Sequence, residues 1–138
     1  MTMTQAVLTL EATYEDMRRI GPWLADQVGA IGADAFAERV GELELAVHEL
    51  AMNIVDHAYD DATRPGATFD VVMRCEDGDL VVAFDDGGVA YDSGDKPVIG
   101  DEPTVRGYGL FIVEQLAKSV DYQRRDDRNH WTLVFASQ

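Results

Sequence analysis

The feature that most constrains the fold is a run of apolar residues at helical spacing between Asp34 and Tyr59. An apolar residue recurs there every three or four positions, which is typical of a helix that packs one face on a core. The residues concerned are Phe36, Val40, Leu43, Val47, Leu50, Ile54 and Ala58. The run ends in the loop-like segment DDATRPG, which contains a proline and a glycine. We therefore predict a long amphipathic helix.

The same helix carries Glu49, Asn53 and His57 at four-residue spacing, within the stretch HELAMNIVDH. This stretch is not the zinc motif H-E-x-x-H, because Met52 stands where the second histidine is needed. At about 100° per residue, Asn53 and His57 lie about 80° and 40° from Leu43, at the edge of the buried face. Glu49 and Asn53 offer two oxygen ligands on adjacent turns, which suits a hard cation such as Mg²⁺, or a carboxylate that polarises a hydroxyl near a phosphate. On spacing alone, a solvated glutamate and an ordinary helix-flank asparagine are the favoured interpretation.

The flanking sequence predicts the remaining elements. Residues 7–11 alternate as a short edge strand, and Thr13 can cap a helix that Gly21-Pro22 should bend or interrupt. The segment ATFDVVMRCEDGDLVVAFDD predicts two strands joined at Asp77-Gly78, a strong hairpin signal. Further on, YGLFIVEQLAKSV predicts a helix that opens on glycine, and VDYQRR and HWTLVFA predict a hairpin around DDRN.

The order of these elements is β-α-α-β-β-loop-α-β-β. This order predicts an α+β fold of two layers, in which a mixed, mostly antiparallel sheet carries about three helices on one face. No internal repeat or linker divides the sequence, so we expect residues 1–138 to form a single domain.

Two glycine-containing segments are candidate ligand sites. In VVAFDDGGVAYD the inward face of the strand continues to Asp86, whose carboxylate can meet a ring amino group where glycines let the backbone come close. The GYG at 107–109 opens a helix, and free N–H groups at a helix start bind phosphate. Each pattern also fits an ordinary turn or helix start. The irregular segment 87–107 between them is typical of a functional loop or lid.

Taken in order, these motifs resemble those of the GHKL (Bergerat-fold) ATPases, which include DNA gyrase, heat-shock chaperone ATPases and sensor histidine kinases. Within that superfamily the chain is similar to the small anti-sigma-factor serine/threonine protein kinases. ELAVHELAMNIVDHAYDD resembles their N-box helix, DGGVAYD their D-x-G-x-P-F-D segment, and GYGLFIVEQLAKSVDYQRRDDRNHWTLVF their G-L-G-L-F-I-V helix and final hairpin. The resemblance extends from about Leu8 to Phe135 and implies a Bergerat ATP-binding fold.

The resemblance implies a role for each matching residue. Asn53 would ligate a Mg²⁺ ion that bridges the phosphates of ATP, and Glu49 would be the general base or hydroxyl-orienting group. Asp86 would accept a hydrogen bond from the adenine amino group, and Gly88 would allow close approach. The other implied nucleotide-binding residues are His57, Arg106, Gly107, Gly109 and Leu110. Phosphoryl transfer would then depend mainly on positioning and charge neutralisation.

The sequence departs from the family pattern at two points. The tandem DDGG permits either Asp85 or Asp86 as the adenine-binding carboxylate. We favour Asp86, because it keeps the inward face of the strand and because the YD at 91–92 then matches the family's Phe-Asp. Ala90 stands where the family has proline, which leaves the stiffness of that turn open, and residues 93–106 match a lid that varies within the family.

Composition limits the partners. Eleven basic and 26 acidic residues give a formal net charge of −15, which argues against direct binding of nucleic acid or anionic membranes. So acidic a protein would need a metal ion and backbone N–H groups to hold phosphates. We see no secretory signal and no membrane-length apolar stretch, and therefore expect a cytoplasmic protein. The single cysteine, Cys75, excludes an intrachain disulfide and is predicted to be a buried thiol.

The resemblance predicts an ATP-dependent serine/threonine kinase that phosphorylates a STAS-type anti-sigma-factor antagonist and binds a sigma factor or another regulator. It also suggests a homodimer. The alternative is a non-catalytic ATP-binding module that sequesters its partner, although pure binding does not require Glu49. A sensor-kinase catalytic domain is disfavoured, since no phosphoacceptor or dimerisation helix accompanies the motifs. A gyrase- or chaperone-type ATPase is disfavoured because the chain lacks room for a large lid and transducer.

Overall fold

The computed structural model describes residues 5–60, 62–91 and 105–137, with the backbone alone for residues 105–108. The described strands are β1 (Gln5–Glu11), β2 (Thr68–Glu76), β3 (Asp79–Asp86), β4 (Ser119–Arg125) and β5 (Arg128–Phe135). The α-helices are α1 (Ile20–Ala30), α2 (Val40–His57) and α3 (Val105–Leu116), and the 3₁₀ helices η1 (Asp16–Arg19) and η2 (Asp34–Arg39) precede α1 and α2.

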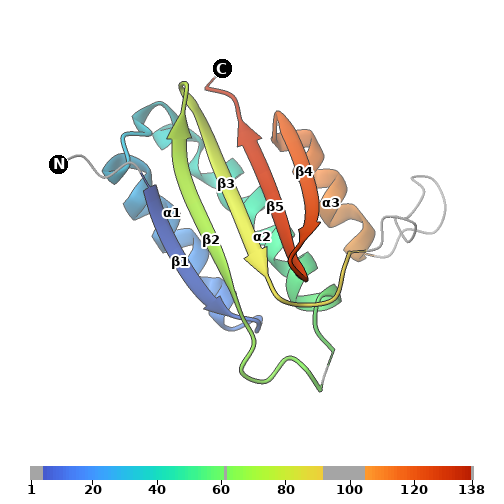
Figure 1. The fold of residues 1–138 in the computed structure, drawn as a ribbon. Helices are drawn as coiled ribbons and strands as arrows, with labels where there is room; N and C mark the ends of the chain where they lie inside the picture. Colours follow the sequence, from blue (N-terminus) through green and yellow to red (C-terminus); the bar gives the residue numbers. More distant parts are fainter. Residues whose placement is uncertain (1–4, 61, 92–104, 138) are drawn as a thin grey trace.

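The strands form one sheet in the order β1-β2-β3-β5-β4, and α1, α2 and α3 lie together on one of its faces (Figure 1). All four neighbouring pairs are antiparallel. The sheet is antiparallel throughout because β5, the second strand of the last hairpin, lies beside β3. If β4 had taken that place beside β3, the two strands would have been parallel. The predicted α+β sandwich with three helices on one face is confirmed.

The predicted long helix is also confirmed, and its first turns are the 3₁₀ helix η2. Seven residues of α2 are buried: Leu43, Ala46, Val47, Leu50, Ala51, Ile54 and Val55. They join one hydrophobic core with the inward side chains of β2, β3 and β5. The predicted interruption of the first helix falls where η1 gives way to α1. Pro22 lies in the first turn of α1, where its missing N–H is not needed.

Both hairpins turn through two residues. Asp77-Gly78 was the predicted turn, and its φ angles of 53° and 86° suit a tight hairpin that follows the twist of the strands. The last hairpin turns at Asp126-Asp127, with φ angles of 54° and 60°. The predicted four-residue turn DDRN is therefore wrong by two residues, because aspartate tolerates the left-handed conformation. As a result Asn129 belongs to β5.

Two expectations from composition have structural counterparts. Among the described residues, no helix combines the length and the apolar character that crossing a membrane requires. Cys75 is a free thiol on β2 that is partly rather than fully buried. Burial raises the pKa of this thiol above its ordinary value.

Candidate functional site

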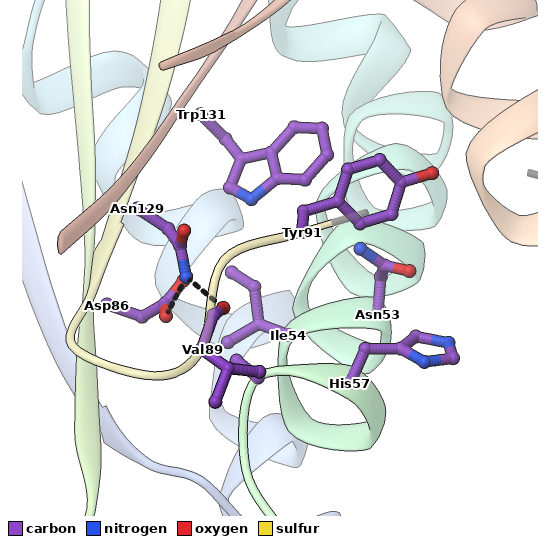
Figure 2. A pocket seen from close by; sticks show the side chains of 9 residues that line it. Asn53, Ile54, His57, Asp86, Val89, Tyr91, Asn129 and Trp131 are labelled. Atoms are coloured by element: carbon purple, nitrogen blue, oxygen red, sulfur yellow. Dashed lines mark hydrogen bonds between the residues drawn. The ribbon is translucent and has the colours of Figure 1, made fainter. Parts of the chain in front are cut away.

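A pocket lies between the C-terminal half of α2 and the ends of β3 and β5 (Figure 2). Its helix wall consists of Asn53, Ile54, His57 and Ala58, and its sheet wall of Asp86, Val89, Tyr91, Asn129 and Trp131. The walls surround about 220 Å³ of empty space, part of which is open to solvent.

Asp86 is the most unusual residue of the pocket. It is fully buried, and its Oδ1 accepts hydrogen bonds from the Gly88 N–H at 2.9 Å and from Asn129 Nδ2 at 2.8 Å. Its Oδ2 is also buried but has no hydrogen-bond partner among the described residues. Burial raises the pKa of the Asp86 carboxyl, against the two hydrogen bonds that lower it. Since buried polar atoms are nearly always paired, Oδ2 is an acceptor that a bound ligand could satisfy.

The structure separates the two tandem aspartates. Asp85 alternates to the opposite face of β3, where its carboxylate lies 2.6 Å from Arg128 Nε and is partly exposed. Asp86 continues the inward face and lines the pocket. Of the two registers that the sequence left open, only the one with Asp86 puts a carboxylate in this pocket.

Asn129 was missed by the sequence analysis and is the second buried polar residue of the sheet wall. Its Nδ2 donates to Asp86 Oδ1 and, at 2.8 Å, to the Val89 carbonyl (Figure 2). We placed this residue in a turn, which hid its inward position on β5. The alternation of Asn129, Trp131 and Leu133 would have revealed it had the hairpin turn been placed two residues earlier.

The α2 stripe lies on the other side of the pocket. Asn53 is half-buried, His57 is exposed, and both project from the helix wall (Figure 2). Glu49 lies one turn earlier and does not line the pocket; it faces α3, where a Cβ atom on Gly109 would come within 2.9 Å of its Oε2. The side chains of Glu49, Asn53 and His57 form no hydrogen bond with other described residues. The structure thus puts Asn53 and His57 in the pocket and Glu49 beside it.

Asn53 is the one predicted metal ligand. The described residues contain no group of three or more His, Cys, Asp or Glu side chains that could hold a metal ion. Protein-bound Mg²⁺ often has few protein ligands and completes its shell with water and substrate phosphates. The half-buried amide of Asn53, at the open side of the pocket, fits such a shared site.

The predicted glycine positions have different surroundings. A Cβ atom at Gly88 would lie 2.3 Å from the Ala58 carbonyl oxygen, so this glycine is needed for contact with the end of α2. Helix α3 begins at Val105, three residues before Tyr108, where the predicted helix segment started. Gly107 therefore lies in its first turn, where N–H groups are free, and Gly109 in the second, where they are not.

Two further predicted residues, Leu110 and Arg106, lie on α3. Leu110 is 9% exposed and belongs to the hydrophobic core, so it has a packing role, and its nucleotide contact stays a prediction. The side chain of Arg106 lies outside the described part of the structure. The predicted lid residues 92–104 also lie outside it.

The order of the elements and the place of the pocket match the fold expected of the ATPase-like domains of the GHKL superfamily. More narrowly, residues 10–135 match the histidine kinase-like ATPase domain, and the chain belongs to this family. The predicted histidine kinase-like ATPase domain is thereby confirmed. No curated protein matches the chain.

Solved structures that are similar to this chain include the following three. The structure of the RsbU and RsbW domains of Rv1364c from Mycobacterium tuberculosis aligns with a TM-score of 0.63 and 20% identity, over 96% of this chain and 32% of that one. The histidine kinase domain of the blue-light activated kinase EL346 from Erythrobacter litoralis gives 0.51 and 19%, over 84% and 60%. The Acinetobacter baumannii histidine kinase AdeS gives 0.54 and 10%, over 100% and 70%.

These likenesses establish the fold. The chain spans about a third of the length of the Mycobacterium tuberculosis structure and 60% of the Erythrobacter litoralis one. What those longer proteins do through their other parts does not transfer to this chain.

Proposed function

We propose that this protein is an ATP-dependent serine/threonine protein kinase of the partner-switching type. It would phosphorylate a STAS-type anti-sigma-factor antagonist and act as an anti-sigma factor in the cytoplasm. The observation that carries the proposal is the buried Asp86 Oδ2, which has no partner among the described residues and belongs to the pocket. The amino group of adenine is a donor that suits this oxygen. The likeness to an RsbW-containing structure and to two histidine kinases supports kinase chemistry.

The two walls divide the work in this proposal. The sheet wall binds the base through Asp86, and the helix wall directs Asn53 toward the phosphates. Asn53 would hold Mg²⁺, which neutralises phosphate charge when bound. Glu49 lies one helical turn, about 6 Å, before Asn53 on α2. From there its carboxylate would orient the serine or threonine hydroxyl of the partner and accept its proton.

The test is a phosphoryl-transfer assay with labelled ATP, Mg²⁺ and STAS-type antagonist proteins from the native host. Wild type should label a serine or threonine. Glu49→Gln should bind ATP with unchanged affinity, whereas transfer should fall by roughly 10²–10⁴-fold. Normal transfer by this variant would contradict the assignment of Glu49.

Glu42→Gln is the matched control. Glu42 lies two turns earlier on the same flank of α2, is exposed, and pairs with Arg39 at 3.5 Å. Neither ATP binding nor transfer should change in this variant.

A second candidate function is a non-catalytic module that binds ATP and sequesters its partner. It is favoured by the position of Glu49, which faces Gly109 and does not line the pocket. Capture of partners from the native host with and without ATP separates the two functions. Nucleotide-dependent capture of a sigma factor or antagonist without any labelled serine or threonine would favour the module. Sedimentation of the free protein would test the proposed homodimer.

A further inference from the structure

We propose that Asn129 is the positioning residue of the pocket. Its amide holds the Asp86 carboxylate, and it also holds the segment after β3, residues 87–91, which we call the strap. The ligand of this arrangement is taken to be adenine, so this part of the inference rests on the proposed function. The positioning itself is a property of the free protein and can be tested without a nucleotide.

The amide of Asn129 uses its whole hydrogen-bonding capacity within the protein. Nδ2 donates to Asp86 Oδ1 and to the Val89 carbonyl, both at 2.8 Å. Oδ1 accepts from the Tyr122 hydroxyl and, at 3.0 Å, from Arg124 Nη1. Since Arg124 can only donate and the Val89 carbonyl can only accept, the amide cannot be reversed without losing hydrogen bonds on both sides. Its donor group is therefore fixed toward Asp86.

The strap is fastened at several points by the same neighbours. Arg124 Nη1 donates to the Gly88 carbonyl at 2.7 Å, and the Tyr91 N–H donates to the Tyr122 hydroxyl at 2.9 Å. On the helix side the Val89 N–H donates to the Ala58 carbonyl at 2.9 Å. Among the side chains that the structure describes, Asn129 is the one that donates hydrogen bonds to both the carboxylate and the strap.

Aromatic packing supports the same arrangement. The ring centroids of Tyr122 and Trp131 are 4.7 Å apart, and those of Tyr91 and Trp131 are 5.1 Å apart. The hydroxyl of Tyr122 thus reaches Asn129 from a ring that is itself held in the pocket wall. The sheet wall is consequently ordered before a ligand arrives, which reduces the entropy cost of binding.

The consequence for recognition concerns the two oxygens of Asp86. Asn129 and the Gly88 N–H occupy Oδ1, so Oδ2 is the oxygen left for a ligand. A carboxylate without this tether could rotate and present either oxygen. Asn129 thereby selects which oxygen meets the ligand and in which direction it points.

The first test is hydrogen exchange in the free protein. Asn129→Ser, which is too short to reach both partners, should increase exchange at the Val89 and Tyr91 amides about tenfold or more. Exchange in the β1–β2 pair should stay unchanged. His130→Gln is the control, because His130 is the next residue on β5 and faces the opposite side, 3.9 Å from Asp85. Unchanged strap exchange in Asn129→Ser would overturn the inference.

The second test is ATP affinity as a function of pH for Asn129→Asp, a nearly isosteric change. The new carboxylate would face Asp86, so ATP affinity should fall about tenfold or more near neutral pH and recover at acid pH, where one proton can bridge the pair. Wild type over the same range is the reference for the other ionisable groups near Asp86 and Asn129. These groups are Asp85, Tyr59, Arg128, Tyr122, Arg124 and His57.

A general loss of packing would lower affinity without this recovery, and that outcome would overturn the inference. If Asn129→Asp does not fold, Tyr122→Phe takes its place. This variant keeps the ring and removes the hydroxyl that orients the amide, and it should weaken ATP binding a fewfold; unchanged binding and unchanged strap exchange would contradict the role. If wild type binds no ATP, the proposed function fails, and the exchange experiment alone decides on Asn129.

Discussion

The two walls of the pocket are built in opposite ways. On the sheet wall Asp86 and Asn129 are 0% and 2% exposed and tied to each other and to the strap. On the helix wall Asn53 is half-buried and His57 exposed, and neither makes a side-chain hydrogen bond with another described residue. One wall is ordered by the protein itself, and the other leaves its polar groups available.

This difference suggests two kinds of recognition. A buried, fixed acceptor suits a rigid group whose donor always comes from one direction, such as an amino group on a flat ring. Half-exposed oxygens suit a hydrated cation and phosphates, whose ligands can rearrange. In the proposed function, the buried polar network of the sheet wall would bind the base, and flexible contacts of the helix wall would bind the charged part of the nucleotide.

The largest expected effect comes from removing the acceptor of the sheet wall. Asp86→Asn puts a donor where the free oxygen stands, so ATP affinity should fall by roughly 100-fold or more. Asp85→Asn is the control, because Asp85 faces away from the pocket and pairs with Arg128. Isothermal titration of both variants checks the prediction. Equal losses of ATP affinity in the two variants would contradict the assignment of Asp86, rather than Asp85, as the acceptor in the pocket.

The contact between the two walls is tested by Gly88→Ala. The added Cβ would meet the Ala58 carbonyl oxygen at 2.3 Å, so the free energy of unfolding should drop by about 1–3 kcal/mol. Gly41→Ala is the counterpart in α2, where an added Cβ meets nothing within 4 Å. It should stabilise the protein by about 0.5–1 kcal/mol. Urea denaturation measures the free energy of unfolding of both variants. An unchanged value for Gly88→Ala would show that the strap does not pack closely against the end of α2.

The helix wall is tested by Asn53→Ala. The variant should keep the magnesium-free affinity for ATP and lose the increase that Mg²⁺ produces, by about tenfold. Titrations with Mg²⁺ and with a chelator give the two affinities. A variant that still responds fully to Mg²⁺ would show that Asn53 is not the ligand.

The smallest effect concerns stability and pH. Burial raises the folded-state pKa of the Asp86 carboxyl above its ordinary value of 3.8. The stability linked to the protonated carboxyl is therefore fully present below pH 3.8. It is lost as the pH rises through the folded-state pKa. Asp86→Asn removes this pH-dependent loss of stability, because asparagine does not ionise. At neutral pH the variant should be more stable than wild type by about 1 kcal/mol, and the gap should close toward pH 4. A gap that is constant with pH would contradict the assigned cause.

Regular patterns in the sequence predicted the fold well, whereas features that depend on local backbone geometry were not predicted. The spacing of Leu43, Leu50 and Ile54 located α2, because burial of one helix face imposes that period. Asp86 was found because the inward alternation of β3 continues to it. Asn129 was missed because two aspartates at positive φ make a turn that a glycine usually marks.

The surroundings of the glycines were also beyond prediction. Gly88 was assigned to close approach of a ligand, yet its nearest neighbour is the backbone of Ala58. Such a contact joins the end of α2 to the segment after β3, and no local pattern encodes it. Similarly, the position of Gly109 against Glu49 depends on how α3 packs on α2.

The central claim is that Asp86 Oδ2 receives the amino group of an adenine base, and a nucleotide that differs only there tests it most directly. Inosine triphosphate carries a carbonyl oxygen where ATP carries the amino group. Isothermal titration of wild type should give an affinity for inosine triphosphate at least roughly 100-fold below that for ATP, since two acceptors would face each other. Asp86→Asn should reduce or abolish this preference. Equal affinity of the wild type for both nucleotides would contradict the account.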